Sequence, residues 1–167
     1  CSHLEKLSLR SVDRSITDES LIALGTHCTT LRSINISHST DVTLVGLSSL
    51  VQGCTRLTTI IISQSEITTN SCMSAIATHC PQLEVLELNH CEDITAAGFN
   101  SLAAHSHRLR SVSLWYSPAL TATIIRSFAV NFPHLEEFFL IYCEQITRAD
   151  VVAINQEYPQ MKLRIHV

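Results

Sequence analysis

The sequence repeats with a period of 26 residues, and this period limits the possible folds more than any other feature. The positions that mark it are Cys28, Cys54 and Cys80, followed at the same step by Ser106, Phe132 and Tyr158. Six copies and the start of a seventh fill the 167 residues. A unit of this length cannot bury an apolar face alone, so each repeat has to stack on its neighbours. The period therefore predicts a solenoid.

Each repeat changes its hydrophobic period once. Apolar residues first alternate in the pattern L-x-x-L-x-L, and after a threonine they recur at helical spacing. Every unit is thus predicted to be a strand followed by a helix, with parallel strands on one side and helices on the other. The strand residues predicted to form a continuous core are Leu4, Leu7 and Leu9; Leu31, Ile34 and Ile36; Leu57, Ile60 and Ile62; Leu83, Leu86 and Leu88; Leu109, Val112 and Leu114; Leu135, Phe138 and Leu140.

The helices follow from the same alignment. A threonine is expected to cap each helix, because its hydroxyl can accept a hydrogen bond from an unpaired backbone N–H. These caps are Thr17, Thr43, Thr95, Thr121 and Thr147, with Thr68 or Thr69 in the third repeat, where the register is one residue irregular. The helix residues expected to face inward are Leu21 with Leu24, Leu47 with Leu50, Met73 with Ile76, Phe99 with Leu102, Ile125 with Phe128, and Val151 with Ile154. The ending "MKLRIHV" alternates Met161, Leu163, Ile165 and Val167 and is expected to form an irregular last strand.

The pattern resembles the leucine-rich repeat, and specifically its cysteine-containing subtype. In that subtype the strand ends in Cys rather than Asn and an "IT" pair opens the helix, as in "CPQLEVLELNHCEDIT" of this chain. The resemblance covers the whole chain. It implies an α/β fold, a curved right-handed horseshoe of six repeats of about 26 residues plus a C-terminal strand. Residues 1–167 are expected to be a single domain, and because the chain begins at Cys1 inside a repeat, a fragment of a longer polypeptide.

His79 beside Cys80 and His90 beside Cys91 suggest a zinc site at first. These residues lie at opposite ends of one predicted strand, however, whereas structural zinc needs convergent ligands at short spacing. We expect no metal and interpret the cysteines as small buried residues. Parallel, equivalent thiols point alike, so we expect reduced cysteines and an intracellular protein, cytoplasmic or nuclear. Cys91 and Cys143 share their strand-end position with Val12, Ser39, Ser65 and Ser117.

Composition and motifs exclude several functions. A formal net charge of -4 gives no basic surface for nucleic acid, and no apolar run is long enough to cross a membrane. The chain has no G-x-S-x-G motif, no glycine-rich phosphate loop and no isolated carboxylate pair, so we expect neither an enzyme nor a cofactor.

The residues between and after the core positions are expected to face solvent on the open, concave side of the sheet. Three rows are expected there: Arg10, Ser37, Ser63, Asn89, Trp115 and Ile141; Ser11, His38, Gln64, His90, Tyr116 and Tyr142; Ser8, Asn35, Ile61, Glu87, Ser113 and Phe139. The last repeats thus gather an apolar patch on a surface that is otherwise polar. We predict that Trp115, Tyr116, Phe139, Ile141 and Tyr142 bind a partner, with Asn89 and His90 at a polar margin. Covering of the patch by another part of the chain is the alternative.

The resemblance also implies a role. Cysteine-containing leucine-rich repeats are known chiefly from F-box proteins, the substrate receptors of cullin-RING ubiquitin ligases. By resemblance, this chain would be the substrate-binding domain of such a receptor, and the ligase adaptor would bind a region outside it. The alternative is a structural scaffold of a large assembly, ciliary, mitochondrial or other, with no ligase role.

Overall fold

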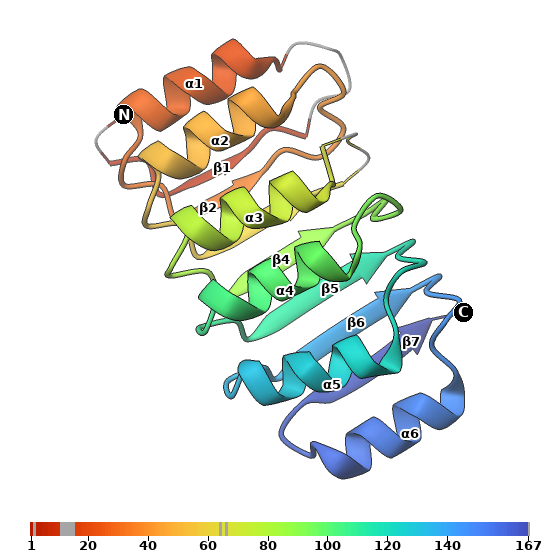
Figure 1. The fold of residues 1–167 in the computed structure, drawn as a ribbon. Helices are drawn as coiled ribbons and strands as arrows, with labels where there is room; N and C mark the ends of the chain where they lie inside the picture. Colours follow the sequence, from red (N-terminus) through yellow and green to blue (C-terminus); the bar gives the residue numbers. More distant parts are fainter. Residues whose placement is uncertain (2, 11–15, 64, 66, 167) are drawn as a thin grey trace.

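The computed structural model describes residues 1, 3–10, 16–63, 65 and 67–166. Ser11, Val12, Gln64 and Val167, whose positions are predicted above, lie outside these residues. Strands and helices alternate along the described chain (Figure 1). The strands are β1 (Lys6–Ser8), β2 (Ser33–Asn35), β3 (Thr59–Ile62), β4 (Val85–Leu88), β5 (Ser111–Trp115), β6 (Glu137–Ile141) and β7 (Lys162–His166). The helices are α1 (Asp18–His27), α2 (Leu44–Gly53), α3 (Asn70–His79), α4 (Ala96–His105), α5 (Ala122–Asn131) and α6 (Arg148–Glu157).

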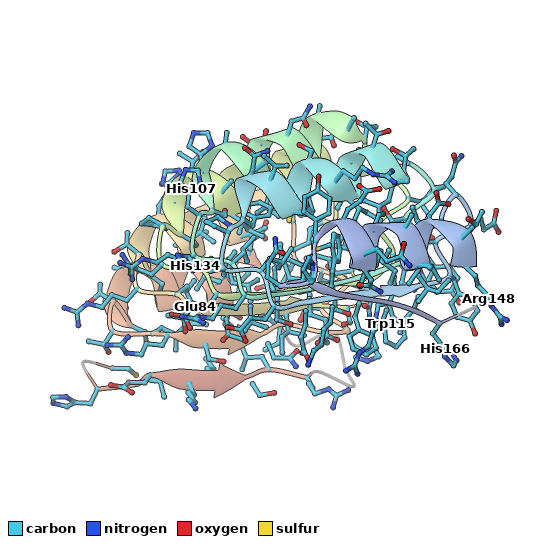
Figure 2. All side chains as sticks on the ribbon, turned by 90° about the horizontal axis from the view of Figure 1, so that it is seen from below. Glu84, His107, Trp115, His134, Arg148 and His166 are labelled. Carbon is cyan, nitrogen blue, oxygen red and sulfur yellow. The ribbon has the colours of Figure 1, made fainter. Side chains whose placement is uncertain are left out.

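The strands form one parallel sheet in chain order, β1 to β7. Equivalent residues pair throughout, as in Ile34 with Ile60 and Leu86 with Val112. Strand β7 keeps this register although one residue is missing before it, so Phe138 pairs with Leu163. The helices stack in a second layer on one face of the sheet, and none of the described helices lies on the opposite face (Figures 1 and 2). This is the predicted leucine-rich repeat solenoid.

The predicted core is confirmed. From repeat 2 to repeat 6, all fifteen predicted strand residues are buried, and so are most of the inward helix residues. Leu4, Leu7 and Leu9 of the first repeat are only partly buried, as are Leu24 and Val151. The core therefore runs without interruption through the middle of the stack and thins at the first repeat.

The predicted threonines precede the helices, and the third repeat uses Thr69. The Thr69 hydroxyl accepts a hydrogen bond from the Cys72 N–H, whereas Thr68 is buried and donates its hydroxyl to the carbonyls of Ser65 and His90. The two adjacent threonines thus have separate roles. One starts the helix, and the other ties the irregular turn to the next repeat.

All seven cysteines are described, and all are free thiols. Six are buried, and among those that follow the helices Cys54 donates to backbone, with its Sγ 3.3 Å from the Cys28 carbonyl oxygen. Burial raises the pKa of Cys54 to about 11 and the pKa of Cys72 and of Cys80 to about 12. Because the thiolate is the reactive form, these side chains are inert packing groups with a weak S–H donor.

Two pairs of helices are joined by a side chain that caps the neighbouring helix. The Asp18 carboxylate in α1 accepts from the backbone N–H groups of Thr43 and Gly46 and from the Thr43 hydroxyl. In the same way, the Asn70 side chain in α3 accepts from the N–H groups of Thr95 and Gly98. A Cβ on Gly46 would lie 2.3 Å from the Asp18 Oδ1, so this cap requires a glycine opposite it.

Candidate functional site

The open face of the sheet carries the residues predicted to bind a partner. Strand alternation turns Trp115, Phe139 and Ile141 to this face, where they are half-buried. Trp115 and Ile141 are direct partners across β5 and β6, and Phe139 pairs with Ser113 one step earlier. The Trp115 indole N–H donates to the Ser113 hydroxyl at 3.2 Å, which holds the ring against its own strand.

His90, Tyr116 and Tyr142 form a column of stacked rings, here called the ring column. The His90 and Tyr116 centroids are 5.4 Å apart with the planes 9° from parallel, and the Tyr116 and Tyr142 centroids are 4.9 Å apart at 23°. Tyr116 is 40% exposed and Tyr142 is 48% exposed. The rings follow the strands in successive repeats, so the repeat distance itself sets their spacing.

The ring column stands on an unusual backbone. Its three residues and the equivalent His38 have positive φ angles of 58°, 54°, 52° and 64° respectively. Histidine is tolerated in this left-handed region, but a bulky tyrosine there is an outlier. Neighbouring strands fix the conformation, because the Tyr116 N–H donates to the Ile141 carbonyl and the Tyr142 N–H to the His166 carbonyl. The two tyrosines therefore occupy a position that favours smaller or polar residues.

Asn89 and His90 lie at the margin of the patch, and part of the row beyond them is not exposed. The Asn89 Nδ2 donates to the Ser63 hydroxyl at 2.8 Å, and the His90 Nδ1 lies 3.4 Å from a Glu92 carboxylate oxygen. The expectation that Ser37 and Ser63 face solvent is wrong, since they are only 2% and 9% exposed. The Asn89 side chain covers Ser63 through its hydrogen bond, and the Ser37 N–H donates to the Asn35 side chain at 2.9 Å.

A pocket of about 400 Å³ adjoins the ring column at the ends of β6 and β7. Tyr116 and Tyr142 line it together with Glu144, Ile146, Ile165 and His166. The last four are absent from the predicted site. The alternation of "MKLRIHV" could have indicated Ile165 and His166, had the one-residue shift of the last strand been allowed for.

Arg164 is a further residue that the prediction missed. Its guanidinium carbon lies 5.5 Å from the centre of the Phe139 ring, and the two residues pair across β6 and β7. A cation at this distance is attracted to the ring face. The Arg164 guanidinium therefore lies over Phe139, and Tyr116 and Tyr142 are the exposed aromatic residues of the patch.

The opposite ends of the strands carry charged and polar side chains instead of aromatic ones. A hollow of about 590 Å³ there is lined by Arg32, Arg56, Arg108 and Glu84 among other polar residues. Arg108 already donates to the Gln82 side chain, and Arg110 pairs with Glu136 at 2.6 Å. Figure 2 shows Glu84 and His134 at this edge and Trp115 and His166 toward the other end of the strands. The charges at this edge are mixed, so it gives no clear preference for one ligand.

The four residues considered for zinc do not converge. His79 ends α3 and Cys80 follows it, whereas His90 and Cys91 come after β4. Within the part of the chain that the structure describes, no three His, Cys, Asp or Glu side chains are placed to hold a metal ion. In the same part, no helix is both long and apolar enough to span a membrane.

Comparisons with known proteins identify the repeat. A family model described as a leucine-rich repeat matches residues 27–51. No curated protein matches the sequence. A solved structure, the Rad7 and Elc1 complex of yeast, is similar with a TM-score of 0.47 and 18% sequence identity. The match covers 98% of this chain and 56% of the other, so this chain spans little more than half the length of that neighbour. The matched repeat, the 26-residue period and the parallel sheet under one helix layer show that the chain has the fold of a leucine-rich repeat solenoid.

Proposed function

We propose that this chain is a protein-recognition module whose partner binds the open sheet face at the last repeats. The observation that carries the proposal is the ring column, in which two exposed tyrosines stack at left-handed positions. The leucine-rich repeat is typically a non-catalytic interaction module, which agrees with this function. The core does not need these rings, because they lie outside the buried rows.

The shape and chemistry of the patch favour a protein as its partner. Stacked tyrosines and a half-buried tryptophan offer rigid aromatic area at small entropic cost, and such residues often dominate the energy of an interface. Asn89 and His90 supply a polar rim beside them. Residues just after the strands of a parallel stack form a continuous line along the solenoid, which suits an extended segment of the partner.

A more specific role follows from the cysteine-containing repeat. We propose that the chain is the substrate-binding domain of an F-box-like receptor of a cullin-RING ubiquitin ligase, whose adaptor binds a region outside residues 1–167. The support for this step is the resemblance of the repeat sequence. The buried thiols, with their raised pKa, suit a reducing compartment, so we place this function inside the cell, in the cytoplasm or nucleus.

The test replaces the tyrosines without disturbing the backbone. Asparagine accepts the left-handed conformation, so Tyr116→Asn combined with Tyr142→Asn should leave the melting temperature unchanged or raised. His38→Asn is the matched control, because His38 has the same conformation outside the patch. Capture from cell extract, measured by quantitative mass spectrometry, should lose its specific proteins with the double variant and keep them with the control.

Two results would contradict the proposal. Unfolding of the double variant would show that the rings are structural. Unchanged capture by a folded double variant would place the binding surface elsewhere on the solenoid. Co-purification of a cullin adaptor with the full-length protein tests the ligase role separately, and its absence alongside tyrosine-dependent capture would favour the scaffold.

A further inference from the structure

Glu87 lies in β4, in the middle of the open sheet face. Its direct partners across the sheet are Ile61 of β3 and Ser113 of β5. Strand alternation places Val85 and Asn89 of its own strand on the same face. The diagonal neighbours on this face are Thr59, Ser63, Ser111 and Trp115.

The Glu87 carboxylate has no partner within the described part of the chain. None of its eight neighbours on the face is basic, and its side chain forms no ion pair or hydrogen bond with a described residue. Arg110, just before β5, is paired with Glu136, and Arg164 in β7 lies over the Phe139 ring. Glu87 is also half-buried, so it has already lost part of its hydration and gains from a cation that binds it.

The Trp115 ring lies beside this carboxylate. Its indole N–H donates to the Ser113 hydroxyl at 3.2 Å, and Ser113 is the direct partner of Glu87. The ring therefore leans back along β5 toward the position opposite Glu87, one strand spacing of about 4.8 Å away. A carboxylate and an aromatic ring on neighbouring strands thus border the same part of the open face.

We propose that Glu87 and Trp115 bind an arginine side chain of the partner protein, with its guanidinium paired to the carboxylate and stacked on the indole ring. This inference rests on the proposed function, since it names one group of the segment that binds the open face. A guanidinium is planar, pairs with a carboxylate through two parallel N–H groups and stacks on aromatic faces. The chain already shows such a contact on the same face, where the Arg164 guanidinium carbon lies 5.5 Å from the centre of the Phe139 ring.

Other side chains satisfy fewer of these groups. A purely apolar side chain would cover Trp115 but would desolvate the Glu87 carboxylate without pairing it. An acidic side chain would be repelled. Lysine pairs with the carboxylate, but its compact ammonium group has no planar surface to stack on the indole. The order of preference is therefore arginine, then lysine, then neutral side chains of the same shape.

A probe that carries only this side chain tests the inference without knowledge of the partner. N-acetyl-arginine amide is titrated into the ¹⁵N-labelled chain, and the shifts of its N–H groups are followed by NMR. We expect saturable shifts at residues 87 and 113 and at the Trp115 indole N–H. The citrulline amide has nearly the same shape without the charge, and it should bind about tenfold more weakly, because a hydrogen bond between charged groups is lost.

Glu87→Gln should weaken arginine-amide binding to the citrulline level. Glu137→Gln is the matched control, since Glu137 lies on the same face but opposite Lys162 of β7, and it should leave binding unchanged. Trp115→Leu removes the ring and should narrow the preference for arginine over lysine amide. Equal binding of the arginine and citrulline amides, shifts centred on other residues, or an equal loss in both glutamine variants would overturn the inference.

The capture experiment separates this inference from the proposed function. Glu87→Gln should lose the same proteins as the double variant of Tyr116 and Tyr142. If capture needs the tyrosines while Glu87→Gln captures normally and the amide does not bind, the inference fails and the proposed function stands. If the amide binds at Glu87 while capture is independent of the tyrosines, the site takes arginine and the proposed function fails.

Discussion

The two ends of the solenoid space their helices differently over a sheet of constant spacing. At the first repeats, α1 and α2 touch through their backbones, and a Cβ added to Gly53 would lie 1.9 Å from the Gly25 carbonyl oxygen. At the last repeats, α5 and α6 lie farther apart (Figure 1), and a surface pair joins them, with the Arg126 Nε 2.7 Å from a Glu157 oxygen.

The core under the helices explains this difference. Glycines and the caps from Asp18 and Asn70 bring the early helices together. Under the later ones, Phe128 contacts the rings of Phe99, Phe132 and Phe138. Strand spacing is fixed near 4.8 Å by backbone hydrogen bonds, so only the helix layer can widen. A wider helix layer bends the sheet toward its open face, and the aromatic patch lies on this part of the sheet.

The largest effect is expected from Phe128→Ala. This change removes the central ring of the late core and should lower the free energy of unfolding by about 3–5 kcal/mol. Val130→Ala, in the same helix but at a 67% exposed position, is the control and should change little. Urea denaturation of both variants measures the difference. Similar values for the two would mean that the rings do not support the wide helix layer.

Gly53→Ala tests the first repeats, where α1 and α2 are in contact. Alanine favours a helix, but its Cβ would meet the backbone of α1, so we expect a net loss of about 1–3 kcal/mol. Asn131→Ala changes the equivalent position of α5, where the exposed side chain donates only to Ser127 of its own helix, and should stay within about 0.5 kcal/mol of the parent. A stabilised Gly53→Ala variant, measured by the same denaturation, would show that the two early helices are not in contact.

Asp18 and Asn70 each cap the helix that follows their own, and of the two side chains only the Asp18 carboxylate can be protonated. Burial raises the pKa of Asp18, but hydrogen bonds from the Thr43 hydroxyl and from the N–H groups of Thr43 and Gly46 have the larger, opposite effect. The pKa of Asp18 is therefore lower than that of an ordinary aspartate. Because its pKa is lower in the folded state, Asp18 stabilises the fold at every pH above the pKa of an ordinary carboxyl group. This stability is lost as the pH falls through the pKa that Asp18 has in the folded protein. Asp18→Asn should therefore lose less stability than the parent between neutral pH and about pH 3.

Thermal melts across this range provide the measurement. At neutral pH the variant should lose less than a missing cap costs, about 1 kcal/mol, because an amide serves at Asn70. Asp150 and Glu157 also have a lowered pKa and remain in both proteins, so the difference between the two curves isolates Asp18. Parallel curves would contradict the role of the carboxylate.

The smallest effect is expected from Arg126→Ala. The pair with Glu157 is exposed, so water and salt screen it, and its removal should hardly change the melting temperature. Whatever difference exists at low salt should disappear at high salt. A large, salt-independent loss would show that this pair, and not the phenylalanine core, holds α5 and α6 in place.

The sequence period predicts the elements, the core rows and five of the six caps, because each depends on residue type at fixed spacing. Helix separation could not be predicted in this way, since it depends on which backbones meet at Gly25 and Gly53. The same holds for the site. The pattern places Trp115, Tyr116 and Tyr142 on the open side, but the stacking of the tyrosines and the pocket beside them depend on left-handed turns and on the shifted register of β7.

The left-handed turn residues also separate the surface of this protein from its architecture. At His38, Tyr116 and Tyr142, hydrogen bonds to the next strand hold the backbone, whatever the side chain. In these repeats, one residue can therefore change its identity at a small local cost while the stack beneath it stays the same. Such a row is open to rapid evolutionary drift toward new ligands. It also gives protein engineers a small set of positions at which substitutions could create a new binding specificity without changing the scaffold.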